Sequence, residues 1–111
     1  MIVKLYCVLD EQDSYGGSSI VVEENQSIEE LRTIIKNEFS LLATIDPSLL
    51  RLWRVDLSPD VYVCKLTDIA NEEKKCLHPL KPVREYFQPG ESHHIRVIIE
   101  IRGRRSYIYY S

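Results

Sequence analysis

The sequence predicts an α+β domain in which a mixed sheet of four to five strands wraps around one main helix, the order of a β-grasp fold. Nearly continuous apolar segments, residues 2–9 and 95–101, open and close the chain. Between them lie an amphipathic helix that follows a hairpin, one further strand and an irregular crossover. Because such a connection lets the first and last strands run in parallel, both apolar segments are expected at the sheet centre.

The N-terminal hairpin is predicted from two strand-like segments and the turn between them. Residues 2–9 are rich in β-branched and aromatic side chains, which favour strands. Residues 13–17 contain two glycines, which can adopt positive φ in a turn. Residues 18–23 then form the second strand, with Ile20 and Val22 on one face.

The helix is predicted over residues 28–39. Ser27 and Glu30 fit a capping box, in which the serine hydroxyl accepts from the Glu30 amide and the Glu30 carboxylate accepts from the Ser27 amide. The apolar side chains recur at helical spacing at Ile28, Leu31, Ile34, Ile35 and Phe39. This spacing predicts an amphipathic helix of about three turns whose apolar stripe covers the hairpin.

The second half of the chain is less regular. In residues 49–57, Leu50 and Leu52 alternate with other side chains, and this alternation predicts a strand whose leucines face the helix. Residues 61–63 indicate a short strand, and residues 68–75 a helical turn or loop. Prolines interrupt the approach to the final strand at Pro79, Pro82 and Pro89.

Length and composition limit the class of protein. A chain of 111 residues with 44% hydrophobic content holds one thin core, so we expect one domain over residues 1–101 and a basic, tyrosine-rich tail or linker start over 102–111. The net charge of −3 does not favour wholesale binding to nucleic acid or anionic membranes. No apolar stretch approaches the roughly 20 residues of a membrane span, and the N-terminus has no recognisable signal peptide.

The segment before the last strand resembles the end of ubiquitin. Glu85 and Tyr86 form an acidic–tyrosine pair, Glu91 and Ser92 follow, and the strand comes next. In ubiquitin the pair lies in a short helical turn before a Glu-Ser loop. Ubiquitin ends in a diglycine used for conjugation, whereas here the matching place reads Arg102-Gly103-Arg104-Arg105. Conjugation is therefore not expected.

A closer resemblance covers residues 2–101. Its landmarks are Val3-Lys4-Leu5-Tyr6-Cys7, Ser27-Ile28-Glu29-Glu30-Leu31, Leu50-Arg51-Leu52-Trp53-Arg54-Val55 and Leu80-Lys81-Pro82-Val83-Arg84-Glu85-Tyr86-Phe87. In this order they resemble the N-terminal header of Crinkler-type effectors, which is ubiquitin-like and precedes variable C-terminal effector modules. The resemblance implies a secreted protein delivered to a host cell, with the host nucleus as one destination.

By this resemblance the domain is a non-catalytic interaction and trafficking header that binds protein partners and needs no cofactor. The alternative is a stand-alone ubiquitin-like adaptor. Oomycete members carry Leu-Phe-Leu-Ala-Lys where this chain has Leu52-Trp53-Arg54-Val55-Asp56. A translocation role tied to that motif is not supported, and the Trp-Arg-Val form is more similar to fungal members.

The predicted binding residues are Trp53, Val55, Arg51 and Arg54. If Leu50 and Leu52 face the helix, alternation places Trp53 and Val55 on the outer face of the sheet, which is expected to be exposed. Tryptophan and arginine together are typical of binding hot spots. The alternative is that Trp53 packs under the 58–75 crossover.

The tail has a basic cluster of Arg102, Arg104 and Arg105. The cluster can be read as a phosphate-binding or nuclear-import patch, or as a solvated linker, and the acidic total charge disfavours nucleic-acid binding. The alternation of residues 107–109 would suit an added strand, on this sheet or on a second copy in a homodimer.

The remaining chemical candidates are Cys64, Cys76 and His78, with His93 or His94. They could supply zinc ligands or a Cys–His nucleophile pair, which would make the chain a small enzyme. Zinc sites usually draw ligands from close pairs such as Cys-x-x-Cys, and no such pair is present. We therefore expect no metal and no catalytic site, and interpret these residues as a buried thiol and loop histidines.

Overall fold

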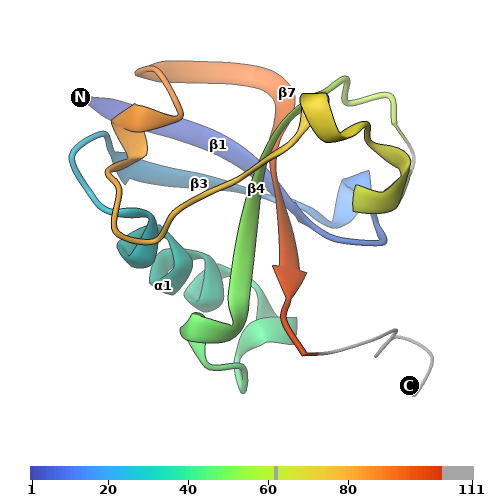
Figure 1. Cartoon of the computed structure of the whole chain (residues 1–111), viewed down its shortest axis with the longest axis horizontal. Coiled ribbons are helices and arrows are strands. Elements are labelled where there is room, and N and C mark those ends of the chain that lie inside the picture. The colour runs from blue at the N-terminus through green and yellow to red at the C-terminus, as the bar shows by residue number, and fades with distance from the viewer. Residues whose placement is uncertain (62, 104–111) are drawn as a thin grey trace.

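The computed structural model describes residues 1–61 and 63–103, and Figure 1 shows a sheet with one helix against it. Its main sheet has five strands in the order β3-β1-β7-β4-β6. These strands span Ser18–Glu23, Ile2–Leu9, Gly90–Ile101, Leu50–Leu57 and Lys75–Cys76 respectively. The helix α1 covers Ile28–Glu38, and a small second sheet joins β2 (Gln12–Asp13) to β5 (Val63–Cys64). The α+β, β-grasp-like prediction is confirmed.

The two terminal apolar segments lie side by side at the centre of the main sheet, as predicted. β1 pairs with β7 in parallel and with β3 in antiparallel orientation. β7 begins at Gly90, five residues before the predicted start at 95. The register between β1 and β7 shifts on both sides of Tyr6, and β7 bends sharply in Figure 1. Register irregularities of this kind bend strands.

The helix forms almost as predicted. Ser27 Oγ accepts a hydrogen bond from the Glu30 amide at 3.1 Å, and the buried face carries Ile28, Leu31 and Ile35. The Glu30 carboxylate instead accepts from Gln26 Nε2 at 3.0 Å and lies 3.5 Å from Ser27 Oγ. The second half of the expected capping box is thus replaced by a contact with Gln26.

Apolar side chains pack on both faces of the sheet. The helix-side core includes Val3, Leu5, Leu31, Leu52 and Val97. The second core, here called the outer core, lies on the opposite face and consists of Val8, Val55, Cys64, Leu66, Ile69, Ile95 and Ile98. Three members of the outer core come from residues 64–69. This part of the crossover between β4 and β7 therefore covers the outer face of the sheet.

The crossover itself differs from the predicted elements. Its strand is β5 at Val63–Cys64, not 61–63, and residue 62 lies outside the described part. The 68–75 region contains a 3-10 turn at Asn71–Glu73, and β6 then adds an edge strand by pairing with Trp53 and Arg54. β2 and β6 were not predicted because two-residue strands carry no periodic pattern.

Candidate functional site

Trp53 lies at the centre of a polar cluster on the outer face of β4. Its indole Nε1 donates to Glu100 Oε1 at 3.0 Å, and Arg51 Nη1 lies 3.8 Å from the same carboxylate oxygen. Lys74 Nζ stands 5.8 Å from the centroid of the tryptophan ring, within the range of a cation–π contact. We call Arg51, Trp53, Lys74 and Glu100 the Trp53 platform.

The predicted four-residue patch is not continuous. Val55 lies on the outer face as predicted, but it is only 2% exposed because Cys64, Leu66 and Ile69 pack over that face. The expectation that Val55 is exposed is therefore wrong. Trp53 is half-buried and packs against the outer core, so part of the alternative interpretation holds.

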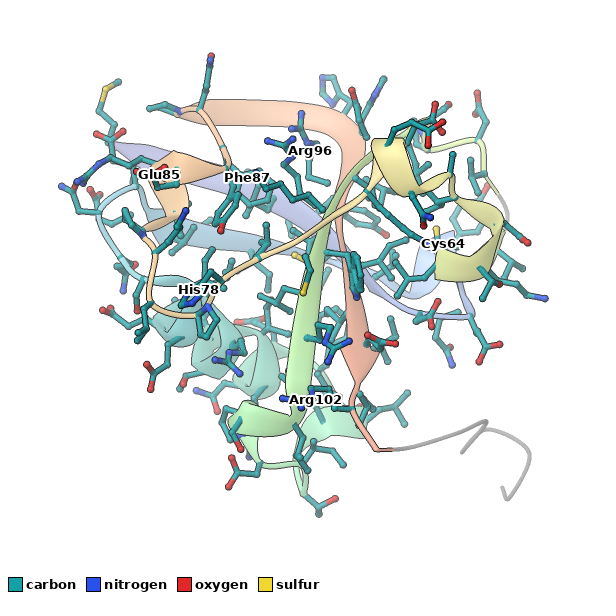
Figure 2. The ribbon with its side chains drawn as sticks, viewed as in Figure 1. Cys64, His78, Glu85, Phe87, Arg96 and Arg102 are labelled. Atoms are coloured by element: carbon teal, nitrogen blue, oxygen red, sulfur yellow. The ribbon has the colours of Figure 1, made fainter. Side chains whose placement is uncertain are left out.

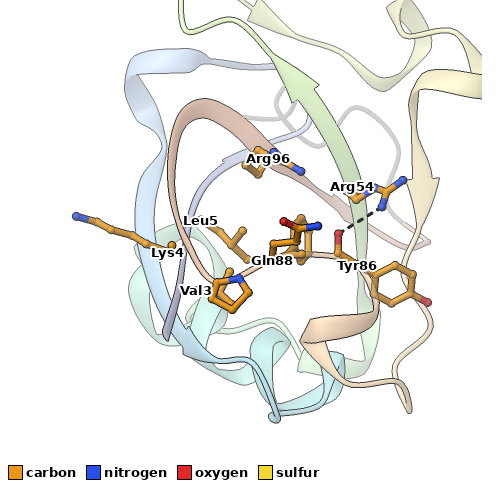
Figure 3. Close-up of a pocket in the computed structure, with 10 residues that line it drawn as sticks. Val3, Lys4, Leu5, Arg54, Tyr86, Gln88 and Arg96 are labelled. Atoms are coloured by element: carbon orange, nitrogen blue, oxygen red, sulfur yellow. Dashed lines mark hydrogen bonds between the residues drawn. The ribbon is translucent and has the colours of Figure 1, made fainter. Parts of the chain in front are cut away.

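Arg54 departs from the patch in a different way. It lines a pocket of about 370 Å³ together with the helix-side residues Val3 and Leu5, and it also lines a second pocket with Lys74 of the Trp53 platform. Its Nη1 donates to the Tyr86 carbonyl at 3.3 Å, as Figure 3 shows. The binding role of Arg51, Trp53 and Arg54 stays a prediction.

A second arginine, Arg96, reaches the same pocket from β7. Its guanidinium carbon lies 5.8 Å from the Phe87 ring centroid. Its Nε is buried without a hydrogen-bond partner among the described residues, at a cost of about 1–3 kcal/mol for a buried unpaired donor. Sequence reasoning missed Arg96, although a charged residue inside the apolar run 95–101 was a usable signal.

The Cys/His candidates are not brought together. Cys64 is buried in the outer core, whereas Cys76 and His78 are exposed. Figure 2 shows Cys64 and His78 on opposite sides of the molecule. In the described part of the chain, no group of three or more His, Cys, Asp or Glu residues is placed to hold a metal. Burial raises the pKa of the Cys7 thiol well above its ordinary range, which disfavours the nucleophilic thiolate.

The basic tail is described only at its start. Arg102 is exposed, and its amide donates to the Leu49 carbonyl at 2.7 Å. Arg104, Arg105 and the tyrosine-rich residues 107–110 lie outside the described residues, so the nuclear-import and homodimer predictions are untested. Among the described residues, no helix is long and apolar enough to cross a membrane.

These observations define a β-grasp-like domain whose candidate sites are a surface platform and a pocket lined by two arginines. Residues 3–100 match the Crinkler effector protein N-terminal domain. The chain therefore belongs to the Crinkler family. No curated protein and no solved structure shows significant similarity to it.

Proposed function

We propose that this domain is the non-catalytic interaction and trafficking header of a Crinkler-type secreted effector that acts inside a host cell. Membership of the family over residues 3–100 is the observation that carries the proposal. Its partners are proteins, namely a C-terminal effector module and factors of the host cell, including factors that lead to the nucleus.

The Trp53 platform supports an interaction role. A half-buried tryptophan beside Arg51, which keeps a side-chain exposure of 40%, combines the residue types that dominate binding energy in protein interfaces. The hydrogen bond to Glu100 holds the indole in one orientation. Such preorganisation lowers the entropy lost when a partner binds. The platform replaces the four-residue patch as the surface to test.

The test compares three single variants of the full chain in quantitative capture from host-cell extract, followed by binding measurements with each purified candidate. Arg51→Ala and Trp53→Ala are expected to weaken a specific partner about 30-fold, which corresponds to a hot-spot loss of about 2 kcal/mol. Val21→Ala is the matched control, because Val21 is 53% exposed and lies on β3.

Thermal unfolding of each variant separates binding from folding. Trp53 contacts the outer core, so its truncation will also lower stability, whereas Arg51 is a surface residue. Equal affinity of Arg51→Ala and wild type for every captured partner would exclude the platform as the contact surface. Delivery is tested separately with a fluorescent fusion of the full chain, which should reach the host-cell interior and nucleus.

A further inference from the structure

The pocket formed by Arg54 and Arg96, here called the arginine pocket, arises from an irregularity in the sheet. Arg54 of β4 pairs with Val97 of β7, so the two arginines stand on neighbouring strands one position apart in register. Beyond Arg54 the pairing shifts before it resumes at Leu57. The strands there leave a pocket of about 370 Å³ between the sheet and the segment 86–90.

Both guanidinium groups are held in place but keep unused donors. Arg96 lies 5.8 Å from the Phe87 ring, and a guanidinium stacked on a ring keeps its N–H donors at its edge. The Nε of Arg96 is buried without a partner in the described part of the chain. Arg54 uses Nη1 for the Tyr86 carbonyl. Neither arginine forms an ion pair with a carboxylate among the described residues.

Two pockets share this arginine pair, and their linings differ. The neighbouring pocket is also lined by Lys74 and Lys75, but Asp56, Glu72 and Glu73 offset most of its positive charge. The arginine pocket is instead lined by Val3, Lys4, Leu5, Tyr86, Phe87, Gln88, Pro89 and Gly90. Figure 3 shows Arg96, Gln88 and Arg54 around its opening. Because no carboxylate is among the residues that line the arginine pocket, an anion binds more favourably there than in the neighbouring pocket.

We propose that the arginine pocket binds a phosphate monoester. The two guanidinium groups carry two positive charges, and a monoester supplies a charge of about −1.5 to −2 and three acceptor oxygens at neutral pH. A carboxylate would offset only one of these charges. The apolar side chains of Val3, Leu5 and Phe87 suit the carbon portion of the ester. The arginine pocket is lined by no residue of the Trp53 platform, and the inference does not depend on the proposed function.

The experiment is an NMR titration of the full chain with phenyl phosphate, observing the arginine Nε–H signals and the Gly90 amide. Wild type is expected to show saturable shifts at both arginines, and Arg54→Gln or Arg96→Gln to weaken binding about tenfold or more, as for a lost charge-assisted hydrogen bond. Arg102→Gln is the matched control, because Arg102 lies at the opposite end of the molecule from Arg96 in Figure 2. Its affinity should equal that of wild type.

Three further ligands sharpen the result. Benzoate keeps the ring but carries one charge, so it should bind at least about tenfold more weakly than phenyl phosphate. Inorganic phosphate and a phosphoserine tripeptide distinguish a free phosphate compound from a phosphorylated protein as the source of the group. The proposal is overturned if phenyl phosphate causes no saturable shift below about 50 mM, or if the Arg54, Arg96 and Arg102 variants bind it equally.

Because Arg96 stacks on Phe87, its replacement could disturb the fold. Arg96→Lys keeps the charge and the stem but removes the Nε donor and the planar fork. It should preserve the unfolding temperature more closely than Arg96→Gln and still weaken phenyl phosphate binding. A folded Arg96→Lys variant with wild-type affinity would show that the buried Nε has no part in the site.

Discussion

The two faces of the central sheet are both apolar, but they are covered in different ways. The helix face is covered by α1, whose buried Leu31 and Ile35 lie on one regular stripe. The outer face is covered by residues 63–76 of the crossover, in which Leu66 lies in the 3-10 turn Leu66–Asp68 and Ile69 lies between this turn and the turn Asn71–Glu73. A helix satisfies most of its backbone hydrogen bonds internally, whereas the crossover has only single-turn bonds of its own and takes others from other parts of the chain.

Those external bonds are visible in the structure. The Glu11 amide donates to the Cys64 carbonyl at 2.7 Å, and Asp10 Oδ1 accepts from the Leu66 amide at 2.9 Å. Within the crossover, Lys74 Nζ donates to the Leu66 carbonyl at 2.6 Å. The outer cover is thus attached to the end of β1 by a few polar contacts and a small core. We expect it to open before the helix face does.

The largest effect is expected on the helix face. Leu31 is fully buried between α1 and the sheet. Leu31→Ala should lower the free energy of unfolding by about 3–5 kcal/mol, because the rigid helix cannot collapse onto the cavity. Urea denaturation followed by circular dichroism measures this change. A loss below about 1 kcal/mol would contradict the assignment of this face as the main core.

A smaller effect is expected on the outer face. Leu66 is 6% exposed and sits in a 3-10 turn that can relax toward the sheet, so Leu66→Ala should cost about 2 kcal/mol. Hydrogen exchange sharpens the contrast: the variant should accelerate exchange of amides in residues 63–69 more than of those in α1. Uniform acceleration in both regions would show that the two cores unfold as one unit.

The smallest effect is a pH dependence at the attachment of the crossover. Burial raises the pKa of Asp10 above its ordinary value of 3.8, although the hydrogen bond from the Leu66 amide acts in the opposite direction. The folded state then binds the proton of the Asp10 carboxyl more tightly than the unfolded state does. The contribution of protonated Asp10 to stability is therefore present below pH 3.8 and is lost as the pH rises through the folded-state pKa.

Asp10→Asn removes this titration and keeps an acceptor oxygen for the Leu66 amide. The stability of the variant relative to wild type should therefore increase as the pH rises above about 3.8. Thermal unfolding of both proteins across a pH series provides the measurement, and a difference that stays constant with pH would refute the expectation.

The elements that sequence reasoning predicted well are those with a local signal. The Ser27 cap and the spacing of Ile28, Leu31 and Ile35 predicted α1 to within one residue at its C-terminal end. The alternation of Leu50 and Leu52 placed β4, although the strand starts one residue later because Leu49 belongs to the 3-10 turn Pro47–Leu49. Periodicity reports burial directly when one face of a regular element meets the core.

The site residues were harder to predict because their environment is non-local. Alternation correctly placed Val55 on the outer face, but nothing near it in the sequence shows that Leu66 and Ile69 cover it. Arg54 was grouped with its sequence neighbours, whereas the structure joins it to Arg96, which is 42 positions further along the chain. Only the pairing of β4 with β7 brings these two side chains together.

The amino-acid sequence by itself determined the order of the elements, the helix and its buried stripe, and the family landmarks, since capping, periodicity and apolar runs act over a few residues. The tertiary structure decided how the outer face of the sheet is covered, where β7 bends and which charged side chains lie close together. Those properties depend on contacts between segments distant in the chain, and such contacts leave no periodic trace in either segment.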